Sequence, residues 1–193
     1  MLRALRLAAA ALAFGAFVAG VAAADEIEIR AAGLAPTDEG IVLNADFEVD
    51  LTARLEDALA KGVPLYFVVE FECYRPRWYW LDERIGTATL NLRLSFHALT
   101  RTYRLSSGTL HRSYPTLAEA LLALTRVREW LVLPRGALRP DTTYAAYVRM
   151  RLDTAQLPKP FQVSALANRE WTLASPWKRW EVNGSTLASE AVR

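Results

Sequence analysis

Alternation of apolar and polar residues along four segments constrains the fold of this chain more than any other feature of its sequence. In each segment every second side chain is apolar, at residues 41–51, 65–73, 90–96 and 144–152. Successive side chains of a strand point to opposite faces of a sheet, so this period predicts half-buried strands. Weaker alternation predicts further strands, at residues 27–34, 101–105, 130–133 and 177–182.

Two short segments carry helical signals instead. Residues 53–61 follow Thr52, a favourable N-cap, and place their apolar side chains on one face. Residues 117–127 begin with a capping box, in which Thr116 is the N-cap and Glu119 is the third helical residue. Parallel winding would require a helix between most pairs of strands, so the scarcity of helices favours antiparallel sheets.

We therefore predict a mainly β fold, an immunoglobulin-like antiparallel β-sandwich of seven to nine strands with two short helices in its connections. A single domain spans residues 25–183, and residues 184–193 lose periodicity and are expected to form a disordered tail. Residues 158–161, Pro-Lys-Pro-Phe, are expected to be extended, because a proline restricts the residue before it.

The first 24 residues resemble a secretory signal peptide. Two arginines precede an apolar stretch at residues 7–21, and three alanines follow, ending at residue 24. The alternative is an uncleaved anchor, because the uncharged run is close to the shortest length that spans a bilayer. No cysteine follows the run, so attachment as a lipoprotein is not expected. We predict no stable membrane insertion after cleavage.

Charge gives no support for nucleic-acid binding. The whole chain has 23 basic and 21 acidic residues, a net charge of +2. Removing residues 1–24 removes two arginines and no acid, which leaves a neutral domain. A nucleic-acid binder would carry a marked positive excess on the domain.

Catalytic signals are weak. The chain has neither a nucleophile elbow nor a glycine-rich nucleotide loop, so we predict no catalytic residues and no cofactor. The single cysteine, Cys73, lies in register with apolar neighbours and is expected to be buried and inert. His97 and His111 have no neighbours at the spacing of metal ligands, so no metal site is expected.

Acidic residues form two strand faces. One contains Asp46, Glu48 and Asp50, and the other contains Glu70 and Glu72. Two carboxyls facing each other across a cleft could hydrolyse glycosides. Arginines alternate in the same way at residues 149 and 151 and at residues 75 and 77, which favours charge pairing across neighbouring strands.

The most distinctive stretch of the chain is an aromatic cluster among charged residues. Its core is Trp78-Tyr79-Trp80, and tryptophan, tyrosine and arginine dominate the energetics of protein interfaces. The alternative is that the tryptophans plug the end of the sandwich beneath the arginines. The candidate binding residues are Arg75, Arg77, Trp78, Tyr79, Trp80 and Arg84.

Residues 75–85, RPRWYWLDERI, resemble a signature of domain-of-unknown-function family 4390, which comprises exported proteins of Gram-negative bacteria. Residues 62–65, 102–105 and 151–163 resemble the same family. The resemblance implies a periplasmic location and no established activity, cofactor or catalytic residue. It also implies that the genes of family members lie near genes for a membrane sensor kinase of the nitrogen-regulation type.

We therefore expect a non-enzymatic module that binds another protein of the cell envelope, with the external domain of a sensor kinase as one candidate partner. The alternative is a carrier or sensor of a small apolar or glycan ligand between the sheets, which requires an enclosed cavity of at least about 300 Å³. A hydrolase using the acidic strand faces requires converging carboxyls, at least one with a strongly shifted pKa.

Overall fold

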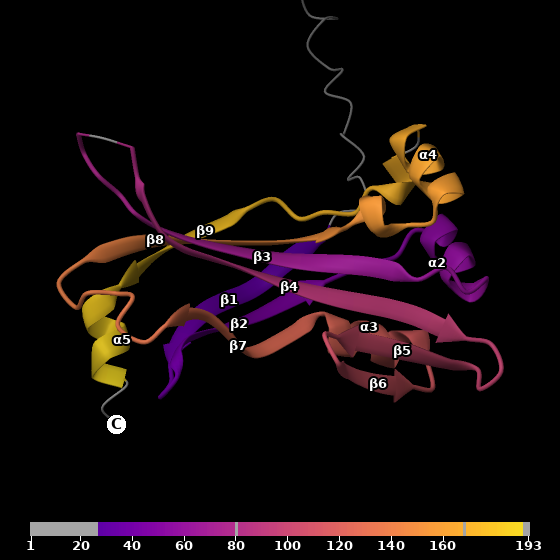
Figure 1. The fold of residues 1–193 in the computed structure, drawn as a ribbon, viewed down its shortest axis with the longest axis horizontal. Coiled ribbons are helices and arrows are strands. Elements are labelled where there is room, and N and C mark those ends of the chain that lie inside the picture. Colours follow the sequence, from indigo (N-terminus) through magenta and orange to yellow (C-terminus); the bar gives the residue numbers. More distant parts are fainter. Residues whose placement is uncertain (1–26, 80, 168, 191–193) are drawn as a thin grey trace, which may run out of the picture.

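Two antiparallel sheets form the fold, which we describe from a computed structural model over residues 27–79, 81–167 and 169–190 (Figure 1). The smaller sheet has the order β1-β2-β7, with β1 at Glu28–Pro36, β2 at Gly40–Glu48 and β7 at Arg126–Pro134. The larger sheet has the order β6-β5-β4-β3-β8-β9. Its strands are β3 (Leu65–Arg75), β4 (Glu83–His97), β5 (Thr102–Ser107), β6 (Leu110–Tyr114), β8 (Thr143–Leu152) and β9 (Lys178–Asn183).

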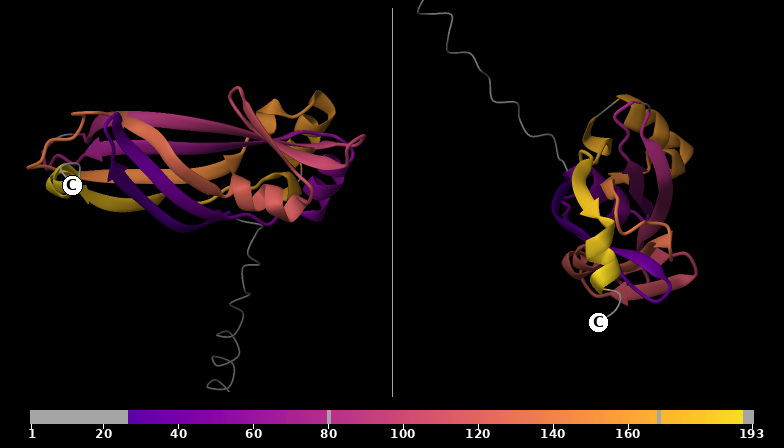
Figure 2. Two further views of the ribbon diagram at one scale, coloured as in Figure 1. Left: turned by 90° about the horizontal axis from the view of Figure 1, so that it is seen from below. Right: turned by 90° about the vertical axis from the view of Figure 1, so that its left-hand side faces the viewer.

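The small sheet lies across one face of the large one, as the two turned views in Figure 2 show. The side chains between the sheets come from the alternating positions of β2, β3 and β8. On β3 the inward residues Phe67, Val69 and Phe71 have no exposed surface. Burying each such side chain contributes about 1.5–3 kcal/mol to folding. The prediction of a mainly β antiparallel sandwich is confirmed.

All four strongly alternating segments form strands, but the structure adds one strand that the sequence did not predict and extends another. Strand β6 lies at the edge of the large sheet and is exposed almost throughout, so it has no buried face to create an alternating pattern. The first half of β4 contains Gly86, Thr87, Ala88 and Thr89, which carry little apolar signal. Pairing with β3, from Arg75 opposite Glu83 onward, holds this half in the sheet.

The two predicted helices are present, with the predicted caps. Helix α2 (Ala53–Ala60) begins after Thr52, whose hydroxyl accepts a hydrogen bond from the N–H of Leu55 at 3.2 Å. Helix α3 (Leu117–Leu124) begins after Thr116, whose hydroxyl accepts from the N–H of Glu119 at 3.2 Å.

Residues 158–161 are not extended as predicted. Helix α4 (Lys159–Ala167) begins there, and the N–H of Phe161 donates to the carbonyl of Pro158 at 2.9 Å. Pro160 fits because the first turn of a helix needs no backbone donor. The ring of Phe161 packs against the buried Trp171 of the short helix η2 (Arg169–Trp171), with centroids 5.4 Å apart.

Helix α5 (Gly184–Glu190) occupies the segment for which a disordered tail was predicted. Its first residue, Gly184, donates its N–H to the carbonyl of Thr142 at 3.0 Å. Leu187 is buried, which gives the helix an apolar anchor that one leucine in a polar sequence did not reveal.

The predicted signal peptide, residues 1–24, lies outside the described residues. Within the part of the chain that the structure describes, no helix combines the length and apolar character needed to cross a membrane.

Candidate binding surface

The connection between β3 and β4 projects beyond both sheets, at the upper left of Figure 1. Strand β3 ends at Arg75 and strand β4 begins at Glu83, so residues 76–82 form the loop. The pairing register shifts between Cys73 and Tyr74, which is a β-bulge. Bulges increase the local twist of a hairpin, and this one lies where the two arms leave the sandwich.

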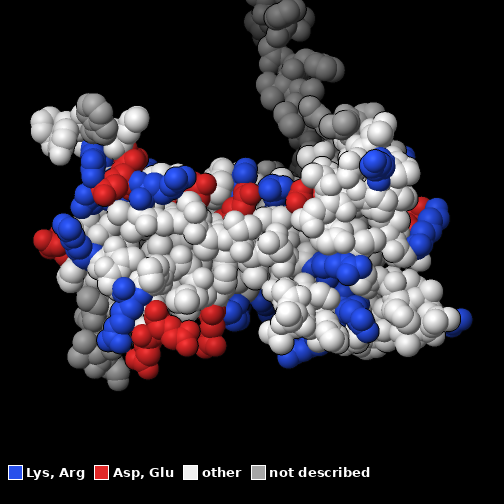
Figure 3. Space-filling view, viewed as in Figure 1, with Lys and Arg blue, Asp and Glu red and all other residues white. Residues whose placement is uncertain are grey.

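The tip of this hairpin exposes large apolar side chains to solvent. Trp78 is 95% exposed, Tyr79 66% and Leu81 81%. The rings of Trp78 and Tyr79 meet edge to face, with centroids 5.2 Å apart. We call these three side chains the aromatic tip. Figure 3 shows it as a projection without charge, above alternating basic and acidic side chains.

The sequence left open whether the aromatic cluster is an exposed binding surface or is buried at the end of the sandwich. Trp78 and Tyr79 are not buried. Both residues lie in a turn, so they do not alternate between sheet faces as a strand would require. Trp80, also a candidate binding residue, lies outside the described residues. Leu81 was not among the predicted site residues, although it continues the run of apolar residues that begins at Trp78.

A charged collar surrounds the base of the loop and consists of Arg75, Arg77, Asp82, Glu83 and Arg84. The guanidinium groups of Arg75 and Arg77 both donate to Glu83 Oε2. The backbone N–H of Arg77 donates to Asp82 Oδ1 at 3.3 Å. Arg84 is exposed and lies opposite Tyr74 in the sheet. Three arginines and two acids give the collar a net charge of +1.

The hydrogen bond from Arg77 is the main cause that lowers the pKa of Glu83 below its ordinary value. Burial opposes this effect and raises the pKa, but the nearby charges of Arg75 and Arg77 lower it again, so the pKa is lowered overall. Glu83 therefore stays ionised at neutral pH and holds both arginines beside the loop.

Below the collar, aromatic rings support the outer face of the hairpin arm. Tyr74 on β3 meets Tyr147 on β8 edge to face, with centroids 5.8 Å apart. Tyr147 meets Trp177 in the same way at 6.5 Å, and the guanidinium of Arg149 lies 4.4 Å from the centre of the Trp177 ring. These contacts connect the projecting arm to the strands beside it.

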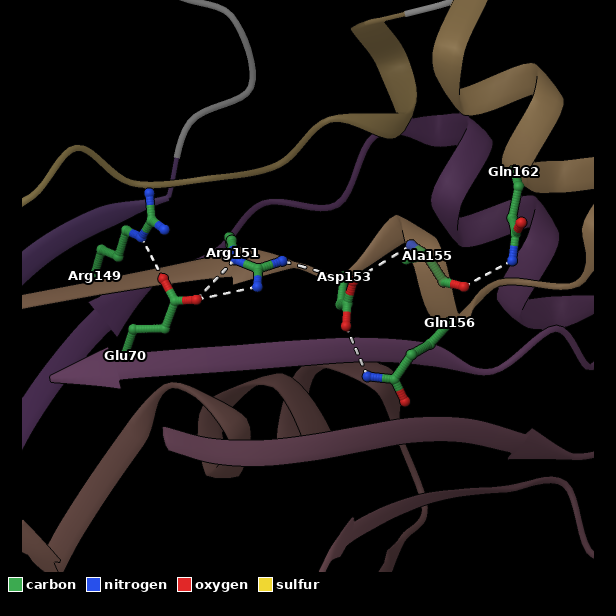
Figure 4. Close-up of polar contacts among 7 residues, drawn as sticks. All are labelled: Glu70, Arg149, Arg151, Asp153, Ala155, Gln156 and Gln162. Atoms are coloured by element: carbon green, nitrogen blue, oxygen red, sulfur yellow. Dashed lines mark hydrogen bonds and ion pairs between the residues drawn. The ribbon is translucent and has the colours of Figure 1, made fainter. Parts of the chain in front are cut away.

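The same face continues into a network of charged side chains, drawn in Figure 4. Glu70 accepts hydrogen bonds from Arg149 and from Arg151, the latter at 3.0 Å from Nη2. Arg151 also pairs with Asp153 at 3.6 Å. Gln156 Nε2 donates to Asp153 Oδ2 at 2.8 Å, so the network reaches the short helix η1 (Thr154–Gln156).

Partial burial alone would raise the pKa of Glu70, but the hydrogen bonds from Arg149 and Arg151 outweigh it and the pKa is lowered. A general acid at neutral pH needs a raised pKa, so Glu70 suits charge pairing. The other acidic face is paired in a similar way, since Asp46 bonds to Arg128 and Glu48 to Arg30.

Cys73, His97 and His111 are the remaining candidates for chemistry. Cys73 is buried in the core, and burial raises the pKa of its thiol to about 11. His97 and His111 are exposed, and Nδ1 of His97 lies 3.0 Å from the hydroxyl of Thr100. Among the described residues, no group of three His, Cys, Asp or Glu side chains could hold a metal ion.

A ligand carrier would need an enclosed cavity between the sheets. The structure has a groove of about 250 Å³ beside α3 that opens to solvent and is lined by Leu90, Leu124, Val127 and Trp130. A pocket of about 330 Å³, also open to solvent, lies at the other end, between the β1–β2 turn and α5. Neither has the enclosed form that the carrier hypothesis predicts.

Comparison with known proteins finds one family. The model of a family described as a domain of unknown function (DUF4390) matches residues 24–181. No curated protein and no solved structure matches the chain. The matched residues include both sheets except the last two residues of β9, together with the charged collar and the aromatic tip. Because the match covers well over half of the sequence, the chain belongs to the DUF4390 family.

Proposed function

We propose that this protein is a non-enzymatic module of the cell envelope that binds another protein through the aromatic tip. The observation that carries the proposal is the exposure of Trp78, Tyr79 and Leu81 together at the end of a projecting hairpin. Contiguous apolar surface is rare on soluble proteins unless a partner covers it. Tryptophan and tyrosine are also the residue types on which binding energy concentrates in interfaces.

The support beneath the tip favours binding over an incidental loose loop. Arg77 bonds both to Asp82 within the loop and to Glu83 on the far arm. Tyr74 packs against Tyr147 on the neighbouring strand. A loop held in one conformation loses less entropy when it binds, so the same contacts give more affinity.

The location in the cell envelope is proposed because residues 1–24 resemble a signal peptide and because the chain resembles a family of exported proteins. The external domain of a membrane sensor kinase is the candidate partner that we would test first. The pairing of Glu70 with Arg149 and Arg151 supports a structural role for the acidic faces and hence a function without catalysis.

Site-specific photo-crosslinking in living cells tests the proposal. A photoreactive amino acid replaces Tyr79, and matched variants carry it at Leu99 and at Glu48. Leu99 is 93% exposed in the β4–β5 turn, at the opposite end of β4, so it controls for exposure and apolar character. We expect one envelope protein to be captured from residue 79 and from neither control. Equal capture from all three positions, or none from residue 79 in folded protein, would refute the proposal.

A further inference from the structure

We infer that the partner of the aromatic tip presents a concave apolar pocket with acidic residues at its rim. This inference rests on the proposed function and specifies the chemistry of the surface that receives the tip. It follows from the shape of the hairpin end and from the charge directly beneath it.

Shape requires a concave partner. Trp78, Tyr79 and Leu81 all remain largely exposed although they are close in sequence, so the tip is convex and open on several sides. A flat surface would cover one side and leave the other apolar side chains in water. A pocket that admits the whole tip removes all three from solvent, and fully desolvated pockets are where interface hot spots occur.

Charge specifies the rim. When the tip is inserted, the charged collar meets the edge of the pocket. One oxygen of Glu83 serves both Arg75 and Arg77, so one carboxylate balances two guanidinium groups. Arg84 adds a further positive charge and Asp82 a negative one, which leaves the collar with a net charge of +1. The collar thus has a surplus positive charge whose complement is a carboxylate on the partner.

The same collar argues for a protein partner and against a lipid surface. Asp82 directly follows Leu81, so an acidic side chain would enter the headgroup region together with the tip. The net charge of the collar is only +1. Recognition of anionic lipid typically uses about four to eight clustered basic residues.

The test measures how the yield of crosslinking from residue 79 depends on the charge of the collar. Arg77→Gln removes the charge, Arg77→Lys keeps it, and Arg112→Gln removes an exposed arginine on the distant strand β6. We expect Arg77→Gln to lower the yield about two- to fivefold, as for loss of an exposed ion pair, and the other two variants to retain most of it. Equal yields in Arg77→Gln and the unaltered protein would overturn the inference.

A charge exchange gives the second readout. Mass spectrometry of the crosslinked peptide locates the contact on the partner, and we expect an acidic residue within it. Replacing that acid with arginine in the Arg77→Glu background should restore the yield that Arg77→Glu alone loses. A captured protein without such an acid, or without restoration, would overturn the acidic rim and leave the proposed function standing.

Vesicles of phosphatidylethanolamine and phosphatidylglycerol, mixed three to one, test the lipid alternative by sedimentation. We expect the purified protein to stay in the supernatant. Sedimentation with the vesicles that Trp78→Ala abolishes would assign the tip to a membrane surface and overturn the inference. Failure to capture any protein from residue 79 would instead refute the proposed function itself.

Discussion

Arg77 donates a hydrogen bond to the carboxylate of Glu83 and so ties the two arms of the β3–β4 hairpin together directly beneath the aromatic tip. Arg75 bonds to the same carboxylate, and the backbone pairing of β3 with β4 ends at Arg75 and Glu83, so beyond this point side-chain hydrogen bonds hold the loop. The orientation of the tip therefore depends on a charge pair that pH and mutation can remove.

Glu83→Gln should reduce stability at neutral pH and have little effect in acid. The pKa of Glu83 is lowered, chiefly by the hydrogen bond from Arg77, so its contribution is present above the ordinary carboxylate pKa of about 4.3. That contribution disappears as the pH falls through the lowered pKa. Urea unfolding of both proteins between pH 7 and pH 2 measures the gap between their midpoints, which should close toward acid. A gap that is constant or widens in acid would contradict this prediction.

Glu70→Ala should destabilise the sandwich by about 1–3 kcal/mol at neutral pH, because it leaves Arg149 and Arg151 without their shared acceptor. The pKa of Glu70 is also lowered, so the loss should shrink as the pH falls below about 4. Free energies of unfolding in urea, compared with the exposed turn variant Glu39→Ala, check the prediction. Equal losses of unfolding free energy in Glu70→Ala and Glu39→Ala would contradict the prediction.

Cys73 should be unreactive in the folded protein. It has no exposed surface, and burial raises the pKa of its thiol to about 11, so almost no thiolate exists at pH 8. We expect a thiol-specific reagent to label the protein only at the rate of unfolding, and fully in urea. Rapid labelling without denaturant would show that the β3 core opens locally.

The elements that could be predicted from the sequence are those that bury one face and therefore show a periodic apolar pattern. Strands such as β3 and β8 bury one face, and that face is visible as alternating apolar residues. Strand β6, which buries little, left no such signal. Helix α5 was not predicted because Leu187 is a single leucine in a polar segment, and because the hydrogen bond from the N–H of Gly184 to the carbonyl of Thr142 joins residues that are distant in sequence.

Part of the candidate site could also be identified from the sequence. A run of aromatic residues between arginines is conspicuous in any sequence, so Trp78 and Tyr79 could be named without a structure. The sequence could not decide whether they were buried, because that depends on the hairpin extending past the sandwich. Nor could it show that Arg75 and Arg77 share Glu83, since this pairing follows from the register of β3 and β4.

Gly184→Ala should detach helix α5. A Cβ atom at this position would lie 1.9 Å from the backbone oxygen of Arg139, a contact that only a shift of the chain can relieve. We expect a loss of about 1–3 kcal/mol, as for overpacking elsewhere. Gly33→Ala is the control, because nothing lies within 4 Å of its added carbon. Thermal unfolding of the two variants should separate them, and equal melting temperatures would show that α5 contributes little.

Trp78→Ala should leave the fold intact and abolish binding. The side chain is 95% exposed, so its removal should change the free energy of unfolding by less than about 0.5 kcal/mol. Trp171→Ala supplies the contrast, because that side chain is 3% exposed and packs against Phe161, and its loss should cost about 3–5 kcal/mol. Urea unfolding measures both effects, and photo-crosslinking from residue 79 measures binding in the Trp78→Ala protein. If Trp78→Ala were as destabilising as Trp171→Ala, the tip would be part of the core, and its exposure could no longer support a binding role.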